Sequence, residues 1–208
     1  MSDALIDDAV TLADSGDARK LLGLAGAPAA GKSTLARRLV DGVNRRLGPY
    51  TAAYVPLDGF HLSNARLERL GLRHRKGAPE TFDVFGYLSL LRRLLSETEY
   101  PVHAPDFDRI VDEPVAASLV VPPRTRLVVT EGNYLADDAP GWREVGELLD
   151  ELWFVEAADS VREERLRERH TTGGMTEESA LAFIEASERP NAERVKRQRA
   201  RCTRVVRV

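Results

Sequence analysis

The chain has 208 residues, of which 43% are hydrophobic and 30% charged, and its formal net charge is −3. These values are typical of one globular α/β domain and exclude a long disordered or fibrous chain, and the weak negative charge argues against nucleic-acid binding through net charge. The single cysteine, Cys202, excludes an intramolecular disulfide framework and a multi-thiolate metal site.

No apolar run reaches the roughly 18 residues that a membrane span needs, and the acidic start MSDALIDDAV lacks the basic character of a secretory signal. We therefore expect one cytoplasmic domain over residues 1–208, with no membrane partner and no nucleic-acid partner. The sequence leaves the oligomeric state open, and a homodimer is one option.

Helical and strand patterns alternate along the chain. Apolar residues at helical spacing predict an N-terminal helix within residues 1–18, with Ser2 as its N-cap. Short apolar runs predict strands at 21–25, 52–57, 126–130, 152–155 and 205–208. Helical spacing predicts further helices at 32–47, 84–96, 160–170 and 176–187. This alternation predicts an α/β fold with a doubly wound, five-stranded parallel sheet.

Two polar segments that contain several prolines, residues 58–83 and 101–123, separate these elements. We expect them to be loops with at most short helices. Loops of this length in a compact domain are usually functional or mobile.

The sequence GAPAAGKS, from Gly26 to Ser33, fits the phosphate-binding pattern G-x-x-x-x-G-K-S between a predicted strand and a predicted helix. Backbone N–H groups of such a loop surround the phosphates of a nucleotide, and the helix directs its positive N-terminus at them. Lys32 would reach the β- and γ-phosphate oxygens, and Ser33 would bind Mg²⁺. The pattern assigns nucleotide binding to Gly26, Ala27, Ala29, Ala30, Gly31, Lys32, Ser33 and Thr34. We expect a P-loop NTPase fold that binds ATP with Mg²⁺.

Among P-loop proteins, a GTPase would carry N-K-x-D, which does not occur in this sequence, and motor ATPases need a longer chain. Small kinases remain. Phosphoryl transfer needs a carboxylate near the acceptor hydroxyl and an acidic group near Mg²⁺. Asp58 and Glu131 each follow a predicted strand, where a parallel sheet opens onto its ligand. We expect Asp58 to be the proton acceptor and Glu131 to orient Mg²⁺-bound water; each could instead cap a turn.

Four motifs, LDGFH, KGAPETFDVFGYLSLLRRL, APDFDR and TEGNYLA, resemble those of the uridine kinase, pantothenate kinase and phosphoribulokinase superfamily, from residue 20 onward. The chain resembles in particular bacterial nucleoside kinase-like proteins described as candidate fructose transport system kinases. The resemblance implies that Asp58 is the catalytic base, that Asp83 helps to bind the acceptor and that residues 105–109 line its pocket. The segment PDFD lacks the family's tyrosine, and His61 stands where nucleoside kinases commonly carry another aromatic residue, which argues against uridine itself as the acceptor.

Further candidates lie in the two polar segments. His61 could hydrogen-bond an acceptor hydroxyl or serve as a structural loop histidine. Arg109, among carboxylates, could bind a polar substrate. Arg73, Arg75 and Lys76 could meet an anionic acceptor such as a sugar phosphate, but a solvated charge run is the favoured interpretation.

The arginine-rich stretch SVREERLRERHTTGG is typical of a lid helix that ends in a glycine hinge, and the resemblance also implies a lid, at about residues 160–187. Arg165 and Arg169 lie four residues apart on one helix face and could neutralise the transferring phosphoryl group; pairing with neighbouring glutamates is the alternative. The following ERPNAERV predicts a turn at Pro190 and Asn191, and the resemblance places Asn191 near adenine.

We therefore expect an ATP-dependent phosphotransferase that acts on a hydroxyl of a small polar metabolite, first a sugar such as fructose, alternatively a nucleoside or a pantothenate-like alcohol. An ATP-binding sensor without turnover is the alternative of another class; it would not need a base at Asp58. An RNA-binding adaptor would rest on the basic tail 194–208 alone. That tail lacks interleaved aromatics and is better explained as a solvated helix that leads into the last strand.

Overall fold

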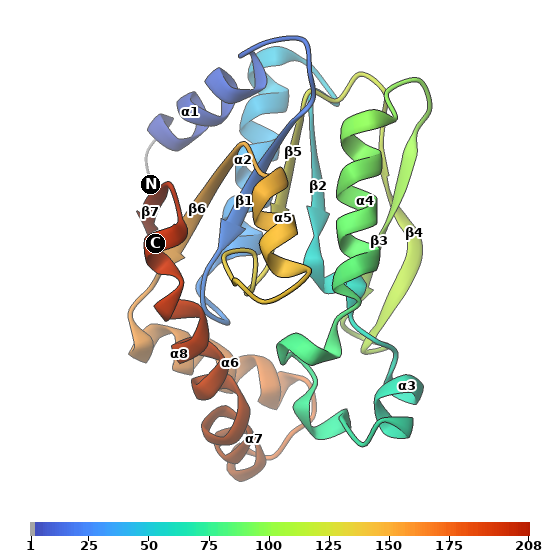
Figure 1. Ribbon diagram of the computed structural model, residues 1–208. Coiled ribbons are helices and arrows are strands. Elements are labelled where there is room, and N and C mark those ends of the chain that lie inside the picture. The colour runs from blue at the N-terminus through green and yellow to red at the C-terminus, as the bar shows by residue number, and fades with distance from the viewer. Residues whose placement is uncertain (1–2) are drawn as a thin grey trace.

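A five-stranded parallel sheet forms the centre of the protein in the computed structural model, which describes residues 3–208 (Figure 1). The strands are β1 (Lys20–Ala25), β2 (Ala52–Pro56), β5 (Leu127–Glu131), β6 (Glu151–Glu156) and β7 (Arg204–Arg207). Their order across the sheet is β2-β5-β1-β6-β7, and every pairing is parallel. The predicted α/β class and its five strands are confirmed.

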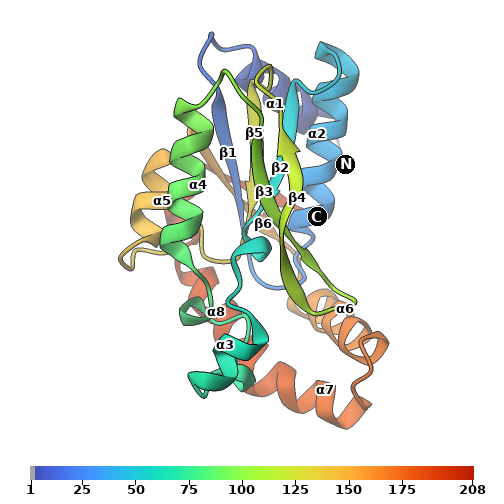
Figure 2. The same ribbon diagram turned by 90° about the vertical axis from the view of Figure 1, so that its right-hand side faces the viewer.

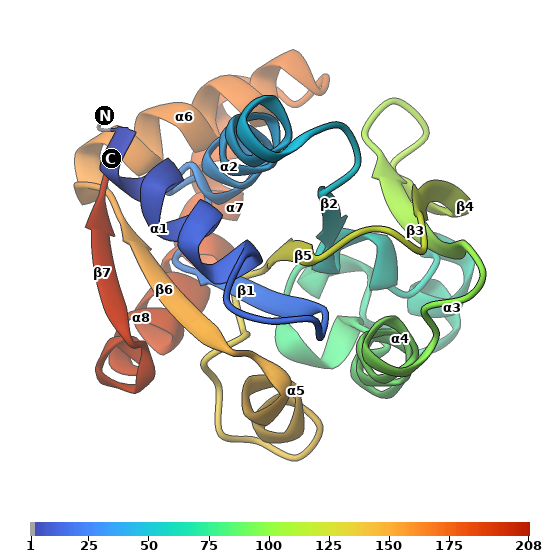
Figure 3. The same cartoon turned by 90° about the horizontal axis from the view of Figure 1, so that it is seen from above.

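Helices cover both faces of this sheet (Figures 2 and 3). One face carries α1 (Asp3–Ala13) and α2 (Lys32–Leu47), and the other carries α4 (Val84–Ser96) and α5 (Trp142–Leu148). The predicted helices 32–47 and 84–96 are confirmed. The N-terminal helix is confirmed from Asp3 to Ala13, whereas Ser2, its predicted N-cap, lies outside the described residues.

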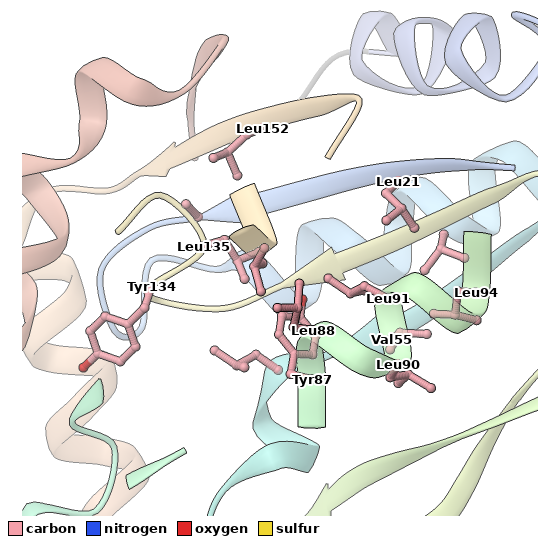
Figure 4. Packing of buried hydrophobic residues seen from close by; sticks show 14 of the residues in the cluster. Leu21, Val55, Tyr87, Leu88, Leu90, Leu91, Leu94, Tyr134, Leu135 and Leu152 are labelled. Carbon is pink, nitrogen blue, oxygen red and sulfur yellow. The ribbon is translucent and has the colours of Figure 1, made fainter. Parts of the chain in front are cut away.

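Helix α4 is fixed to the sheet by apolar packing (Figure 4) and also by one buried series of hydrogen bonds. Tyr87 and Leu91 are fully buried against the sheet. The Tyr87 hydroxyl lies 2.5 Å from Thr130 Oγ1, which donates to the Val55 carbonyl at 2.6 Å. Because buried polar groups are costly without partners, this series of hydrogen bonds fixes α4 across β2 and β5, the two strands that end at the candidate site.

The segment 101–123 is not the predicted loop. It forms an antiparallel hairpin of β3 (Val102–Asp108) and β4 (Glu113–Val121), which lies beyond β2 at the edge of the molecule (Figure 3). Most of β4 is exposed, so it shows no buried alternation, and prolines 105 and 114 interrupt the strand pattern. A two-stranded ribbon tolerates proline because each strand has one edge free of ladder hydrogen bonds.

Four helices gather beyond the carboxyl ends of the sheet strands (Figure 1). They are α3 (Asn64–Arg69), α6 (Asp159–Thr172), α7 (Glu177–Phe183) and α8 (Arg189–Arg197). The predicted turn at Pro190 and Asn191 is wrong. A π-helical turn, Ile184–Glu188, joins α7 to α8, and Pro190 occupies the first turn of α8, where its missing N–H is tolerated. Within residues 3–208, none of the helices is both long and apolar enough to cross a membrane.

Candidate active site

The turn after β1 wraps tightly, and two of its glycines show why the motif needs them. Gly26 has φ 156°, and a Cβ there would lie 2.5 Å from the Val155 carbonyl oxygen. Gly31, with φ 94°, is the N-cap of α2, in the left-handed region that favours glycine. The backbone of the loop is thus packed against β6 and leads directly into α2, as the sequence pattern predicts.

Gly26→Ala is expected to weaken ATP binding at least about ten-fold and to lower the melting temperature, because the new methyl group collides with backbone that cannot rotate away. The check is ATP titration calorimetry together with thermal melting. Gly16 is the matched control, since it also has positive φ, 142°, but its Cβ would meet nothing within 4 Å. Equal losses of ATP affinity in Gly16→Ala and Gly26→Ala would refute the steric explanation.

Lys32 begins α2 with its side chain turned into the protein. It is only 7% exposed, and its Nζ donates to the Ala27 carbonyl at 3.1 Å and to Asn133 Oδ1 at 2.8 Å. Burial lowers the pKa of Lys32, while the negative charges of Glu131 and Asp58 raise it. The two nearby carboxylates thus favour the charged form of the buried ammonium, which can donate to phosphate oxygens from the start of α2.

Ser33 and Tyr54 both donate to one carboxylate oxygen at the end of β5. Ser33 Oγ and the Tyr54 hydroxyl each lie 2.8 Å from Glu131 Oε1. Burial raises the pKa of Glu131, as does the charge of Asp58, whereas Lys32 and the two hydroxyl donors lower it. Burial and the charge of Glu131 raise the pKa of Tyr54, so its phenol stays protonated and remains a donor.

The pair of Ser33 and Glu131 offers hard oxygen ligands, which suit Mg²⁺. No cluster of three or more His, Cys, Asp or Glu side chains in the described part of the chain is arranged to hold a metal ion. A cation held by Ser33 would complete its shell with phosphate oxygens and water, and Glu131 is placed to accept hydrogen bonds from that water.

Asp58 follows β2 in a short helical turn, Leu57–Phe60, and points to the hairpin. Its carboxylate is one-third exposed, and Oδ2 accepts a hydrogen bond from Arg109 at 3.2 Å. The hairpin backbone packs closely here: a Cβ on Gly59 would lie 2.5 Å from the Pro105 carbonyl oxygen. The close packing explains why Arg109, 51 residues further along the chain, reaches Asp58.

His61 lies beside Asp58 between two aromatic rings. Its ring is 4.1 Å from Phe82 and 5.0 Å from Phe107 between centroids, and its Nδ1 is 2.8 Å from the Asp58 carbonyl oxygen. Burial lowers the pKa of His61, so the neutral imidazole prevails near neutral pH. Because a carbonyl can only accept, Nδ1 carries the hydrogen and Nε2 is left as an acceptor.

Two carboxylates pair with the three cations of the predicted basic loop. Arg73 and Lys76 both pair with Asp112, at 3.0 and 2.9 Å, and Arg75 pairs with Glu80 at 2.6 Å. These contacts favour the structural interpretation of the charge run. Asp83 caps helix α4 by accepting from Gly86 N at 2.9 Å, and its predicted contact with the acceptor stays a prediction.

The lid arginines reach different groups. Arg165 donates to the Ala29 carbonyl of the phosphate loop at 3.2 Å, whereas Arg169 pairs with buried Glu188 at 3.0 Å. Arg162, which is 4% exposed, donates to another carbonyl of that loop, and its Nε has no partner among residues 3–208. Helix α6 therefore already contacts the phosphate loop in this conformation.

A cavity of about 720 Å³ opens beside the phosphate loop. It is lined by Ala27, Phe154, Val155, Glu156, Ala157, Ala158, Asp159, Arg162, Lys196, Arg199, Arg207 and Val208. Asn191 is buried in α8 and is not among the lining residues, and its place near adenine stays a prediction.

Three residues that contact the predicted site residues were not predicted from the sequence: Tyr54, Asn133 and Glu188. Two of them could have been predicted from the sequence. Tyr54 lies on β2 and Asn133 lies just after β5, and both strands lead to the sheet edge at which Glu131 was predicted. Glu188 carries no such signal, since its contact with Arg169 depends on the π-helical turn between α7 and α8.

Comparison with known proteins gives a consistent class. No protein-family profile matches the sequence. A candidate uridine kinase of Schizosaccharomyces pombe is 37% identical over 169 residues, which are 78% of this chain and 72% of that protein. A pantothenate kinase of Leifsonia xyli is 33% identical over 139 residues, 66% of this chain and 43% of that protein.

The crystal structure of a candidate fructose transport system kinase from Silicibacter sp. TM1040 is 36% identical, covers 99% of both chains and superposes with a TM-score of 0.88. The chain therefore belongs to the P-loop kinase family that includes uridine kinase and pantothenate kinase homologues. Within that family it is a small-molecule kinase, and relatives named as ATP-dependent kinases support its use of ATP.

Proposed function

We propose that the protein transfers the γ-phosphoryl group of ATP to a hydroxyl group of a small polar metabolite. One observation carries the proposal: Glu131 ends β5 and Asp58 lies two residues after the end of β2, its neighbouring strand, at the edge where the phosphate loop holds Lys32. Asp58 removes the proton of the acceptor hydroxyl while the hydroxyl oxygen forms a bond to the γ-phosphorus. The bond from that phosphorus to the β,γ-bridging oxygen breaks, and ADP leaves with the electron pair.

The remaining roles follow from charge and position. Lys32, Arg165 and Arg169 neutralise the phosphate oxygens, with residues 160–187 acting as the lid of one kinase domain. Ser33 would hold Mg²⁺ and Glu131 would orient the water bound to it; the cation would neutralise charge on the β- and γ-phosphates. The cavity beside Ala27 is of the size of a small-ligand site and lies next to the loop, so we assign it to the nucleoside part of ATP.

We infer that the acceptor is a neutral polyol. Asp112 and Glu80 already pair with the cations of the basic loop and offset two of their three charges, which makes the loop a weaker site for a phosphate ester. His61 Nε2 can accept from one hydroxyl, and Arg109 can donate to an oxygen of the acceptor. We therefore take a free sugar such as fructose as the first candidate, in keeping with the name of the Silicibacter protein. A nucleoside or a pantothenate-like alcohol is the alternative, with Asp83 as a further acceptor ligand in either case.

The test is Mg²⁺-dependent ADP release, measured by a coupled assay across free sugars, nucleosides, pantothenate and sugar phosphates. One neutral acceptor that raises the rate far above the ATPase background is the expected result. A sugar phosphate as the best acceptor would contradict the assignment of a neutral polyol. Tight ATP binding with no stimulation by any acceptor in the panel would favour an ATP sensor without turnover.

A further inference from the structure

Asn133 connects the end of β5 to the lysine of the phosphate loop. It follows Glu131 by two residues, is partly buried, and its Oδ1 accepts from Lys32 Nζ at 2.8 Å. The orientation of the amide follows from chemistry, because a lysine ammonium can only donate and so must face the carbonyl oxygen of the amide.

The ammonium of Lys32 has three N–H donors. The structure gives two of them to Ala27 and Asn133, at 3.1 and 2.8 Å. Two fixed partners determine the direction of the third N–H, which remains for a phosphate oxygen. Without Asn133, the ammonium would be held by one carbonyl and could rotate about it.

The turn that carries Asn133 is itself held firmly. A Cβ on Gly132 would lie 2.5 Å from Leu57, the residue before Asp58, so this turn packs against the turn of the proposed base. On its other side Glu131 accepts from Ser33. The end of β5 therefore holds the side chains of two consecutive residues, Lys32 and Ser33, at the start of α2.

We propose that Asn133 is a positioning residue that fixes the Lys32 ammonium for the phosphates of ATP. The inference rests on the proposed function only in that Lys32 binds ATP phosphates; it does not depend on the identity of the acceptor. Loss of one hydrogen bond to a charged, buried donor predicts that Asn133→Ala raises the Kd for ATP by about ten-fold or more.

A double-mutant cycle tests whether Asn133 acts through Lys32. ATP affinity is measured by calorimetry for the full-length protein, Asn133→Ala, Lys32→Met and the double variant, with thermal melting to verify folding. In the Lys32→Met background, Asn133→Ala should change the Kd by less than about two-fold, because the ammonium that Asn133 holds is gone. Asp138→Ala, an exposed change in the same loop, is the control and should leave the affinity unchanged.

Equal fold losses in both backgrounds would overturn the inference, as would wild-type affinity in Asn133→Ala. If the wild-type protein itself bound no ATP, both this inference and the proposed function would fail. If it bound ATP and the cycle proved additive, only the role of Asn133 would fail. The readout needs no acceptor, so the two failures can be distinguished.

Discussion

Asp58→Asn is expected to lower kcat by about 10²- to 10⁴-fold while the Kd for ATP stays within about two-fold. Asparagine keeps the size and the hydrogen-bonding oxygen of the side chain but cannot take up the acceptor proton. Single-turnover ADP release with the best acceptor, combined with ATP calorimetry, measures the two quantities separately. The control is Asp14→Asn, which removes an exposed carboxylate paired with Arg126 outside the proposed site and should leave both unchanged.

Full activity in Asp58→Asn would remove this residue from the mechanism. Loss of ATP binding would instead give it a role in the nucleotide site. A third result, equal loss in the Asp14 control, would show that the loss is not specific to the carboxylate of Asp58.

The ion pair with Arg109 does not prevent Asp58 from acting as a base. The contact is a single hydrogen bond of 3.2 Å, and the two side chains are 59% and 33% exposed. Solvent-exposed pairs of this kind contribute about 0–1 kcal/mol. An acceptor that hydrogen-bonds both groups can therefore separate them at small cost, and Arg109 would then donate to the acceptor.

Four strands of the sheet, β1, β2, β5 and β6, could be predicted because they are buried on both faces, which gives a continuous apolar run such as Leu21–Ala25. The hairpin of β3 and β4 could not, because it buries little of β4 and carries prolines. Pro190 suggested a turn because proline in a sequence marks both turns and the first turns of helices. Here the backbone stays helical from α7 through the π-helical turn into α8, which the proline itself does not indicate.

The site shows the same division. The phosphate loop could be predicted because its residues are consecutive in the sequence. Asp58 and Glu131 could be predicted as site residues because the carboxyl ends of parallel strands meet at one edge of the sheet. The contacts of Arg109 with Asp58, of Asn133 with Lys32 and of Glu188 with Arg169 join residues 51, 101 and 19 positions apart. Such pairings depend on how the hairpin and helices pack on the sheet, which residue spacing does not specify.

Arg169→Ala is expected to lower kcat by about 10²- to 10³-fold with a smaller change in the Kd for ATP, because charge on the transferring phosphoryl group is largest in the transition state. In this structure Arg169 is held by Glu188, which is only 8% exposed. The charges of both residues also act on Lys32, which places them within electrostatic reach of the phosphate loop. Steady-state kinetics and ATP calorimetry separate the two quantities.

The control lies on the same helix. Arg167 pairs with Glu177 at 2.8 Å, and both side chains are exposed, so Arg167→Ala should leave kcat unchanged within about two-fold. If both arginine variants behaved alike, the arginines of α6 would serve only to solvate and stabilise the helix. If only Arg169→Ala lowered kcat, Glu188 would be the partner of Arg169 in the resting state, and Arg169 would move to the phosphates during turnover. A carboxylate and a phosphate oxygen compete for the same guanidinium donors, so Arg169 cannot serve both fully at once.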